Sequence, residues 1–427
     1  MPNRGKLAVT AGIAIGLIAL GLILRTGQLI ALSLPFVLYM MVFLLLQPSS
    51  SKPPLEIERH LSGTRIEEGG KIEVVLTVVN HGAPIPSLGL TENFPPGIEV
   101  TEGETSCLRS LGTEERITLT YTLRSARGVH QLPGVDVKIW KWLALTQQSV
   151  FLPHEDHFIA LPQAEIIDDI EIRPQRTRAY AGMVRANRGG SGLDFFGCRA
   201  YTPGDDIRYI NWRTYAKRGE LVIDEYEQER IADVSIILDG RERMNTREGK
   251  EDTFTYSVRA AACMASHFID QGNSVGLLIY GDYINWTYPG YGKTQRERIL
   301  EALAQAKPGY KEVFSDLHSV PTRLFPSRSQ LIIVSPLAGE DDVEVLGVLR
   351  ARGYQIIVII PDLLQVQLER LPDDENRDLA QKIVQLRRNF FLSTLTRIGV
   401  EVLVWNIAEP LSYPISWGLS RRGRRLG

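Results

Sequence analysis

The chain has 427 residues, of which 44% are hydrophobic and 23% are charged, and its formal net charge is −2. A chain of this length exceeds what one hydrophobic core usually supports, and so balanced a composition excludes disorder of the whole chain. The near-zero charge gives no general attraction to nucleic acid, so we expect no nucleic-acid partner.

The N-terminal region, residues 1–46, is predicted to be a transmembrane helical hairpin. Two apolar stretches, residues 7–24 and 29–46, have about the helical length that crosses the hydrocarbon core of a bilayer. The residues between them allow only a tight turn, so both ends of the hairpin share one side. A cleaved signal peptide and two buried core helices are the alternatives, but a signal peptide is not usually followed at once by a second span.

Charges that flank the hairpin predict its orientation. The flanking basic residues are Arg4, Lys6, Lys52, Arg59 and Arg65, against Arg25 alone in the turn. The positive-inside bias then places both termini and the soluble domains in the cytoplasm, with the chain held in the lipid bilayer of the cell membrane. A reducing compartment also fits the cysteines, which lack C-x-x-C spacing and lie far apart: Cys107, Cys198 and Cys263.

A Pro- and Ser-rich linker at residues 47–54 precedes a predicted immunoglobulin-like β-sandwich at residues 55–153. Apolar and polar residues alternate along three of its runs, residues 72–79, 117–123 and 135–139. The following residues, His154-Glu155-Asp156-His157, are all possible metal ligands. No helix places the two histidines on one face, so we interpret them as part of a solvated linker.

Strands and helices alternate from residue 232 to residue 407, which predicts a doubly wound α/β domain. Strands are expected at residues 233–239, 275–280, 330–335, 355–360 and 401–405, and helices at residues 253–271, 295–306, 342–352 and 376–398. A connecting segment, residues 154–231, precedes this domain, and a basic tail, residues 408–427, follows it. Such a sheet places function at the carboxyl ends of its strands.

No enzyme motif is complete at those strand ends. Gly292-Lys293-Thr294 is similar to the end of a phosphate-binding loop, but that motif requires a glycine five residues before Gly292, where Thr287 stands. The chain has no G-x-G-x-x-G opening a helix and no G-x-S-x-G elbow. We therefore expect no enzymatic activity, no small-molecule substrate and no cofactor.

A long signature lies between Gly190 and Leu221 and includes Pro203-Gly204-Asp205-Asp206 and Asn211-Trp212. It resembles, almost position by position, the family catalogued as domain of unknown function 58. The tract Glu225-Tyr226-Glu227-Gln228-Glu229-Arg230 matches that family too. The resemblance also covers the order of the parts: two membrane helices, a β-sandwich, the signature and a von Willebrand factor A-like α/β domain.

The signature supplies the candidate binding residues, which are Tyr201, Pro203, Gly204, Asp205, Asp206, Arg208, Asn211 and Trp212. The acidic pair lies close in sequence to Arg199, Arg208 and Arg213, which allows charge-assisted pairing. We favour a clasp that holds the signature against the α/β domain, with Trp212 as a packed anchor. The alternative is a surface that docks a partner, because exposed arginine and tryptophan are favoured at such surfaces.

The resemblance to von Willebrand factor A domains also implies a possible metal site, because these domains often bind a divalent cation through D-x-S-x-S and a later aspartate. Here Asp239 alone remains, since Arg241 and Arg243 replace the serines and Pro336 replaces the later carboxylate. The guanidinium groups would repel a cation, so we expect no metal. A weak, partly hydrated Mg²⁺ site at Asp239 and Ser335 is the alternative.

The resemblance implies a membrane-anchored, non-enzymatic scaffold or adaptor that partners a MoxR-type AAA+ ATPase in the assembly or maturation of other proteins. Two other classes compete with it. A hydrolase using Asp205 and Asp206 as acid and base would lack a nucleophile, a paired histidine and a phosphate loop nearby. A metal-dependent adhesion module would require an extracytoplasmic domain and an intact set of ligands.

Overall fold

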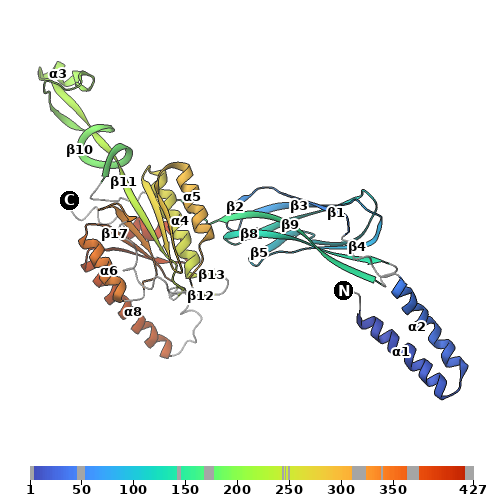
Figure 1. Cartoon of the computed structure of the whole chain (residues 1–427). Helices are drawn as coiled ribbons and strands as arrows, with labels where there is room; N and C mark the ends of the chain where they lie inside the picture. The colour runs from blue at the N-terminus through green and yellow to red at the C-terminus, as the bar shows by residue number, and fades with distance from the viewer. Residues whose placement is uncertain are drawn as a thin grey trace. The chain divides into compact units, whose positions relative to one another are not determined.

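The computed structural model describes residues 4–45, 53–141, 146–167, 177–242, 245, 247–248, 251–309, 324–337, 340–362 and 375–418. The chain divides into two compact units, Met1–Ala160 and Leu161–Gly427. The first unit contains a helical hairpin and two β-sheets, and the second contains a mixed sheet with helices and a long two-stranded ribbon (Figure 1).

Two helices form at the N-terminus, α1 (Arg4–Ile23) and α2 (Gly27–Leu45). They cover residues 7–23 and 29–45 of the two predicted apolar stretches. Over the residues that the structure describes, no helix combines the length and the apolar character needed to cross a membrane. The predicted fold class is therefore wrong in its transmembrane hairpin, and the predicted cellular location stays a prediction.

Two antiparallel sheets make up the rest of the first unit, with the strand orders β1-β3-β7-β5 and β2-β9-β8-β4-β6. The strands are β1 (Leu55–Leu61), β2 (Arg65–Glu67), β3 (Lys71–Asn80), β4 (Ile85–Glu92), β5 (Ile98–Gly103), β6 (Ser106–Leu111), β7 (Arg116–Ser125), β8 (Gly128–Lys141) and β9 (Thr146–Leu161). The predicted alternation is confirmed in β3, where Ile72, Val74 and Leu76 are fully buried. Residues of both sheets share this one core.

Strand β9 continues beyond the predicted end of the sandwich. His157 pairs in register with Gln131 of β8, and Phe158, the next residue, is buried. His154-Glu155-Asp156-His157 therefore lies in a strand and not in a linker, because β8 continues beside β9 and pairs with it on both sides of a register shift between Leu132 and Gly134. Asp156 forms an ion pair of 2.9 Å with Arg59 of β1, which ties it to the sandwich.

His81, which follows β3, has a contact that depends on pH. Its Nε2 lies 2.7 Å from Glu56 Oε2, and its Nδ1 lies 3.0 Å from Glu114 Oε2. The hydrogen bonds to Glu56 and Glu114 raise the pKa of His81 above its ordinary value of 6.5. Because the folded-state pKa is the higher one, the stabilisation is complete below the unfolded-state value and is lost as pH rises through the folded-state value.

Replacing Glu56 with glutamine is expected to lower the pKa of His81 toward its ordinary value, because the imidazolium loses one carboxylate. An NMR titration of the His81 ring protons measures this change. The control is Glu102→Gln, which removes an exposed carboxylate that pairs with Lys71 in the same sandwich at 2.6 Å. Equal His81 titration curves for the wild type and Glu56→Gln would contradict the prediction.

The sheet of the second unit has the order β15-β14-β11-β16-β17-β18. The strands from β14 to β18 along this path are mutually parallel, and β15 pairs antiparallel at the edge. The main elements are β11 (Val222–Asp239), α4 (Thr253–Asp270), β14 (Ser274–Tyr280), β15 (Ile284–Gly290), α5 (Gly292–Gln305), β16 (Gln330–Val334), α6 (Glu340–Ala351), β17 (Gln355–Asp362), α8 (Glu375–Arg397), β18 (Glu401–Asn406) and α9 (Ser412–Gly418). The predicted strands and helices form within a few residues of their expected positions.

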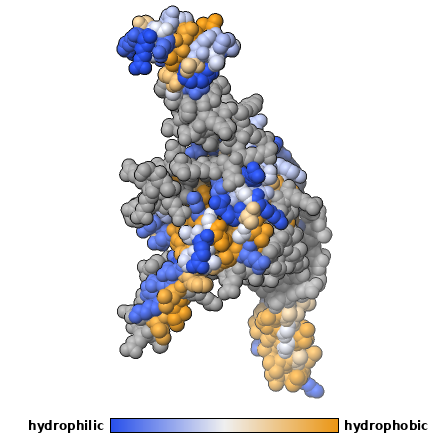
Figure 2. Space-filling model, turned by 90° about the vertical axis from the view of Figure 1, so that its left-hand side faces the viewer, coloured by the Kyte–Doolittle hydropathy of each residue, from blue (hydrophilic) through white to orange (hydrophobic). Residues whose placement is uncertain are grey.

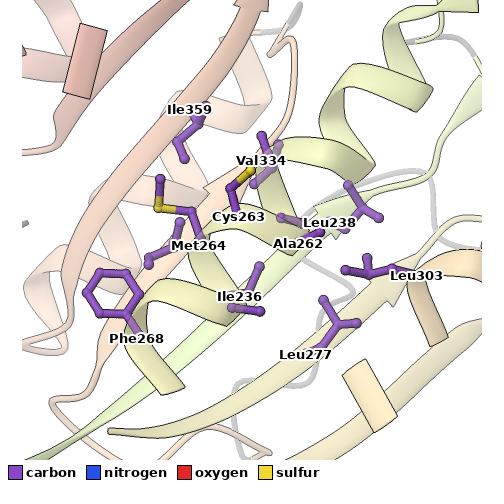
Figure 3. Packing of buried hydrophobic residues seen from close by; sticks show 14 of the residues in the cluster. Ile236, Leu238, Ala262, Cys263, Met264, Phe268, Leu277, Leu303, Val334 and Ile359 are labelled. Atoms are coloured by element: carbon purple, nitrogen blue, oxygen red, sulfur yellow. The ribbon is translucent and has the colours of Figure 1, made fainter. Parts of the chain in front are cut away.

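Helices cover both faces of this sheet, which explains why its strands are nearly continuous apolar runs. On one face, Cys263 and Phe268 of α4 pack with Ile236 of β11 and Leu277 of β14 (Figure 3). On the other face, residues of α6 and α8 pack with the sheet, and Leu395 of α8 is fully buried there. Helix α4 begins where the Asp252 side chain accepts a hydrogen bond from the Thr255 N–H at 2.8 Å.

The predicted basic tail also contributes to this unit. Leu411 and Ile415, the latter in α9, are each 1% exposed and belong to the core that contains α4. The described part of the tail is therefore a structural part of the α/β unit.

A long ribbon replaces most of the predicted connecting segment. Strand β10 (Thr177–Ala200) pairs antiparallel with the first part of β11, and β11 then continues into the centre of the sheet. Sequence periodicity missed this ribbon because the stretch Glu225-Tyr226-Glu227-Gln228-Glu229-Arg230 contains only one apolar residue. The signature begins inside β10, and its candidate binding residues, 201–212, lie in the connection between the two strands.

Candidate functional site

The carboxyl edge of the parallel sheet is the first candidate site. Strands β11 and β16 are neighbours, and the chain leaves them toward opposite sides of the sheet, which makes this the topological switch point where α/β folds bind ligands. Asp239 ends β11, and Ser335 directly follows β16. Both side chains are buried, with residue exposures of 3% and 0%.

Arg241 occupies the space between these groups. Its Nε and Nη2 donate to the two carboxylate oxygens of Asp239 at 2.9 and 2.7 Å, and Nη2 also lies 3.3 Å from Asp342 Oδ1. Ser335 Oγ donates to Asp239 Oδ2 at 2.6 Å. The Arg241 Cζ atom lies 5.3 Å from the centre of the Tyr280 ring. The switch point is therefore filled by an internal ion-pair network.

This network does not fit a divalent cation. Both oxygens of Asp239 and those of Asp342 already accept hydrogen bonds from a positively charged guanidinium group. Among the residues that the structure describes, no cluster of three or more His, Cys, Asp or Glu side chains could hold a metal ion. The sequence placed Arg241 beside Asp239 correctly, whereas Arg243 lies outside the described residues. It missed Asp342, which stands on a helix more than a hundred residues away.

The second candidate site is the signature tip, residues 197–225, at the end of the β10–β11 ribbon (Figure 1). The turn at Thr202–Asp205 closes with a hydrogen bond from the Asp205 N–H to the Thr202 carbonyl at 3.0 Å, and Gly204 has a φ of 111° that glycine readily adopts. A short 3₁₀ helix, η1 (Ile207–Tyr209), and helix α3 (Trp212–Arg218) follow. Both pack against β11.

Side chains of the tip satisfy its backbone groups. Asp206 caps η1 by accepting a hydrogen bond from the Arg208 N–H at 3.1 Å. Asn211 caps α3 by accepting one from the Thr214 N–H at 2.8 Å, and its amide donates to Asp224 Oδ1 at 2.8 Å. Asp206 and Asn211, which were predicted as binding residues, therefore stabilise the fold of the tip, and other side chains of the tip are available to contact a ligand.

The two signature carboxylates do not act as an acid and a base together. Asp205 accepts two hydrogen bonds from the Arg199 guanidinium at 2.6 and 2.7 Å, and Asp206 accepts one of 2.6 Å from Arg208. These bonds hold the pKa of Asp205 well below its ordinary range and lower the pKa of Asp206. Both remain charged near neutral pH, so neither can supply a proton.

The predicted clasp takes a different form in the structure. Arg199 bonds both Asp205 and Glu225, the latter at 2.7 Å, so the ion pairs join the turn to the ends of its own two strands. The pairs are partly exposed, and Trp212 is 58% exposed, so it is not a packed anchor. The prediction that this segment is buried against the α/β core is therefore wrong. Strand β11 joins the sheet only from Asp233 onward, and the tip lies at the other end of the ribbon that precedes Asp233.

The tip exposes hydrophobic and hydrophilic residues next to each other, as the upper part of Figure 2 shows. The exposed apolar residues are Ile207, Tyr209, Trp212, Tyr215 and Leu221. The Trp212 and Tyr215 rings meet edge to face at 6.2 Å. Lys217 and Arg218 line a hollow of about 650 Å³ beside α3. Of these residues, the sequence singled out Trp212 alone. Tyr215 follows Trp212 by three residues and Arg218 follows Tyr215 by three, and this helical spacing is the signal that could have found them.

Comparison with known proteins gives two findings about the sequence. The family described as "Protein of unknown function DUF58" matches residues 197–394, so the resemblance expected from the signature is confirmed and the chain carries a DUF58 region. The uncharacterized protein YeaD of Bacillus subtilis (strain 168) is 24% identical over 279 residues, which cover 64% of this chain and 67% of YeaD.

Solved structures are similar to parts of the chain only loosely. A FixG-related protein from Vibrio parahaemolyticus is 12% identical with a TM-score of 0.18, over 26% of this chain and 98% of that one. Native alpha-2-macroglobulin from Escherichia coli, from domain MG7 to its C-terminus, is 14% identical with a TM-score of 0.24, over 31% of this chain and 21% of that one. At these scores neither likeness supports an argument about function.

Proposed function

From the DUF58 region that the chain carries over residues 197–394, we propose a non-enzymatic adaptor that binds another protein through the signature tip. The observation that carries this proposal is the exposure of Trp212 and Tyr215 on a tip whose polar groups bond to one another. Tryptophan, tyrosine and arginine are the residue types that most often dominate binding energy at protein interfaces.

Internal bonding prepares the tip for binding. The Asp205–Arg199 pair and the Asn211 cap fix the turn and α3 before a partner arrives, so less conformational entropy is lost on association. The closed carboxyl edge of the sheet also favours an adaptor over the two alternative functions. Its carboxylates are bound by Arg241, which does not support a metal-dependent adhesion module. The carboxylates of Asp205 and Asp206 are bound by arginines as well, which does not support the hydrolase.

The partner we propose is a MoxR-type AAA+ ATPase. This proposal rests on the resemblance of the signature to its family. The hollow beside α3 is lined by three basic residues, Arg199, Lys217 and Arg218, and one acidic residue, Glu220, and this basic excess suits an acidic segment of that partner. The role that follows is to bring the ATPase to other proteins during their assembly or maturation.

Replacing Trp212 with alanine is expected to weaken capture of the ATPase at least about tenfold, because a central aromatic side chain of an interface commonly contributes about 2 kcal/mol or more. Co-purification of the ATPase with the tagged full-length chain measures this. The control is Tyr291→Ala, which removes another exposed aromatic ring, 71% exposed, outside the tip. Equal capture by the wild type and Trp212→Ala would contradict docking at the tip, and no capture by the wild type would contradict the proposed partner.

A further inference from the structure

Helix α8 carries apolar side chains on two opposite sides. Its C-terminal half packs into the core of the second unit through Phe391, Leu392 and Leu395. A second set, which we call the outer stripe, consists of Leu379, Ile383, Leu386 and Phe390. These four side chains are 59%, 57%, 70% and 71% exposed.

The outer stripe has the geometry of a helix-binding seam. Its members are four, three and four residues apart, which is the spacing of alternating d and a positions of a heptad repeat. At about 100° per residue they fall within an arc of roughly 60°, and Leu395 lies about opposite. The stripe therefore points away from the core that the same helix packs against. Figure 2 shows hydrophobic residues beside hydrophilic ones on this projecting helix.

Exposing a row of apolar side chains to water is unfavourable in free energy. A row along one helix face is a surface to which the apolar face of a second helix commonly binds. In the same half of α8, Arg388 forms an ion pair of 2.6 Å with Asp362 at the end of β17. This ion pair and the packed residues fix the C-terminal part of the stripe to the second unit.

The charge of the helix selects the kind of partner. The helix has five basic residues, Arg377, Lys382, Arg387, Arg388 and Arg397, against two acidic ones, Glu375 and Asp378, and no acidic residue follows Asp378. Lys382 is exposed and stands beside the stripe. A second copy of this helix would bring like charges together along the seam, whereas a helix with flanking carboxylates would pair with them.

We propose that the outer stripe of α8 binds an amphipathic helix of another protein whose apolar face is flanked by acidic residues. This surface is separate from the signature tip and does not depend on the function proposed for the tip. It gives the chain a second docking surface, which an adaptor needs if it holds two proteins at once.

The test uses the full-length chain and a labelled synthetic helical peptide of about 21 residues, with leucine at a and d positions and glutamate at e and g positions. Fluorescence anisotropy measures binding. The double variant Ile383→Glu/Leu386→Glu is expected to bind at least about tenfold more weakly, because two apolar contacts are replaced by like charges. Lys382→Glu is expected to weaken binding of this peptide and to strengthen binding of a matched peptide with lysine at e and g.

The matched control is Val384→Glu, which places the same charge on the same helix at a partly exposed position outside the stripe. It is expected to bind the acidic peptide as the wild type does, and so is Trp212→Ala in the signature tip. No binding of the acidic peptide to the wild type, or equal binding of the lysine peptide, would overturn the proposal. Sedimentation of the wild type as a dimer, together with sedimentation of Ile383→Glu/Leu386→Glu as a monomer, would also overturn the proposal. The stripe would then bind a second copy of this chain.

Discussion

Replacing Arg241 with methionine is expected to lower the free energy of unfolding of the second unit by several kcal/mol, on the order of 3–5. Methionine has a similar volume but leaves the carboxylates of Asp239 and Asp342 without their cation. Those side chains are only 0% and 4% exposed, so water cannot replace the lost partner. Denaturant unfolding at neutral pH measures the loss.

The guanidinium group of Arg241 keeps its charge near neutral pH. Burial works against the charged form of Arg241, but the hydrogen bonds to Asp239 and the surrounding charges outweigh it and raise the pKa. Burial also raises the pKa of Tyr280 well above its ordinary value, so the ring facing Arg241 stays neutral. Arg241 and Tyr280 therefore both keep their charge states near neutral pH.

The matched control for Arg241 is Arg208→Met in the signature tip. Asp206 and Arg208 have the same spacing as Asp239 and Arg241 and pair at 2.6 Å, but their side chains are 41% and 83% exposed. Water solvates both groups when the pair is broken, so we expect no measurable change in the unfolding midpoint. Identical midpoints for the wild type and Arg241→Met would show that the buried network does not stabilise the fold.

Replacing Arg59 with methionine is expected to have a comparable effect on the β-sandwich, again on the order of 3–5 kcal/mol. The Arg59 guanidinium donates to Glu92 Oε1 at 2.6 Å and to Asp156 Oδ2 at 2.9 Å. It also donates to the backbone carbonyl oxygens of Leu132 and His154. The side chains of Arg59 and Glu92 are fully buried, so the variant leaves a carboxyl group inside the sandwich without its cation.

The pH dependence of this loss gives a second measurement. Burial already raises the pKa of Glu92 in the folded wild type, against the attraction of Arg59. Without Arg59 we expect a larger increase, so the folded variant holds its proton to higher pH than the unfolded chain does. Stability of the variant is then greatest below the unfolded-state pKa and falls as pH rises through the folded-state pKa. The loss should therefore be smaller at about pH 4 than at about pH 8.

The control for Arg59 is Lys71→Met, which breaks an ion pair with Glu102 of the same length, 2.6 Å, on the surface of the same sandwich. Calorimetric melting of the full-length chain follows both variants. We expect Lys71→Met to melt with the wild type and Arg59→Met to melt at a clearly lower temperature. If the two variants melt together, burial of the Arg59–Glu92 pair does not determine the stability of the sandwich.

Local pattern in the sequence was sufficient for the regular elements. Alternation along β3 follows from a strand with one buried face, and the apolar run of β11 follows from a strand covered on both faces. Tertiary pairing decided the exceptions. β9 extends through His154 because β8 lies beside it, and the ribbon of β10 forms along a charged stretch that has no strand periodicity.

The candidate sites show the same division. Asp206-Ile207-Arg208 and Asp239-Gly240-Arg241 have one local pattern, and in both the carboxylate binds the guanidinium two residues later. The sequence by itself predicted this pairing, because opposite charges so close in sequence can form charge-assisted hydrogen bonds. Only the tertiary structure decided that one pair is solvated and the other is buried with Ser335 and Asp342. Burial depends on chain segments distant in sequence, and these set the dielectric environment that gives each pair its energy.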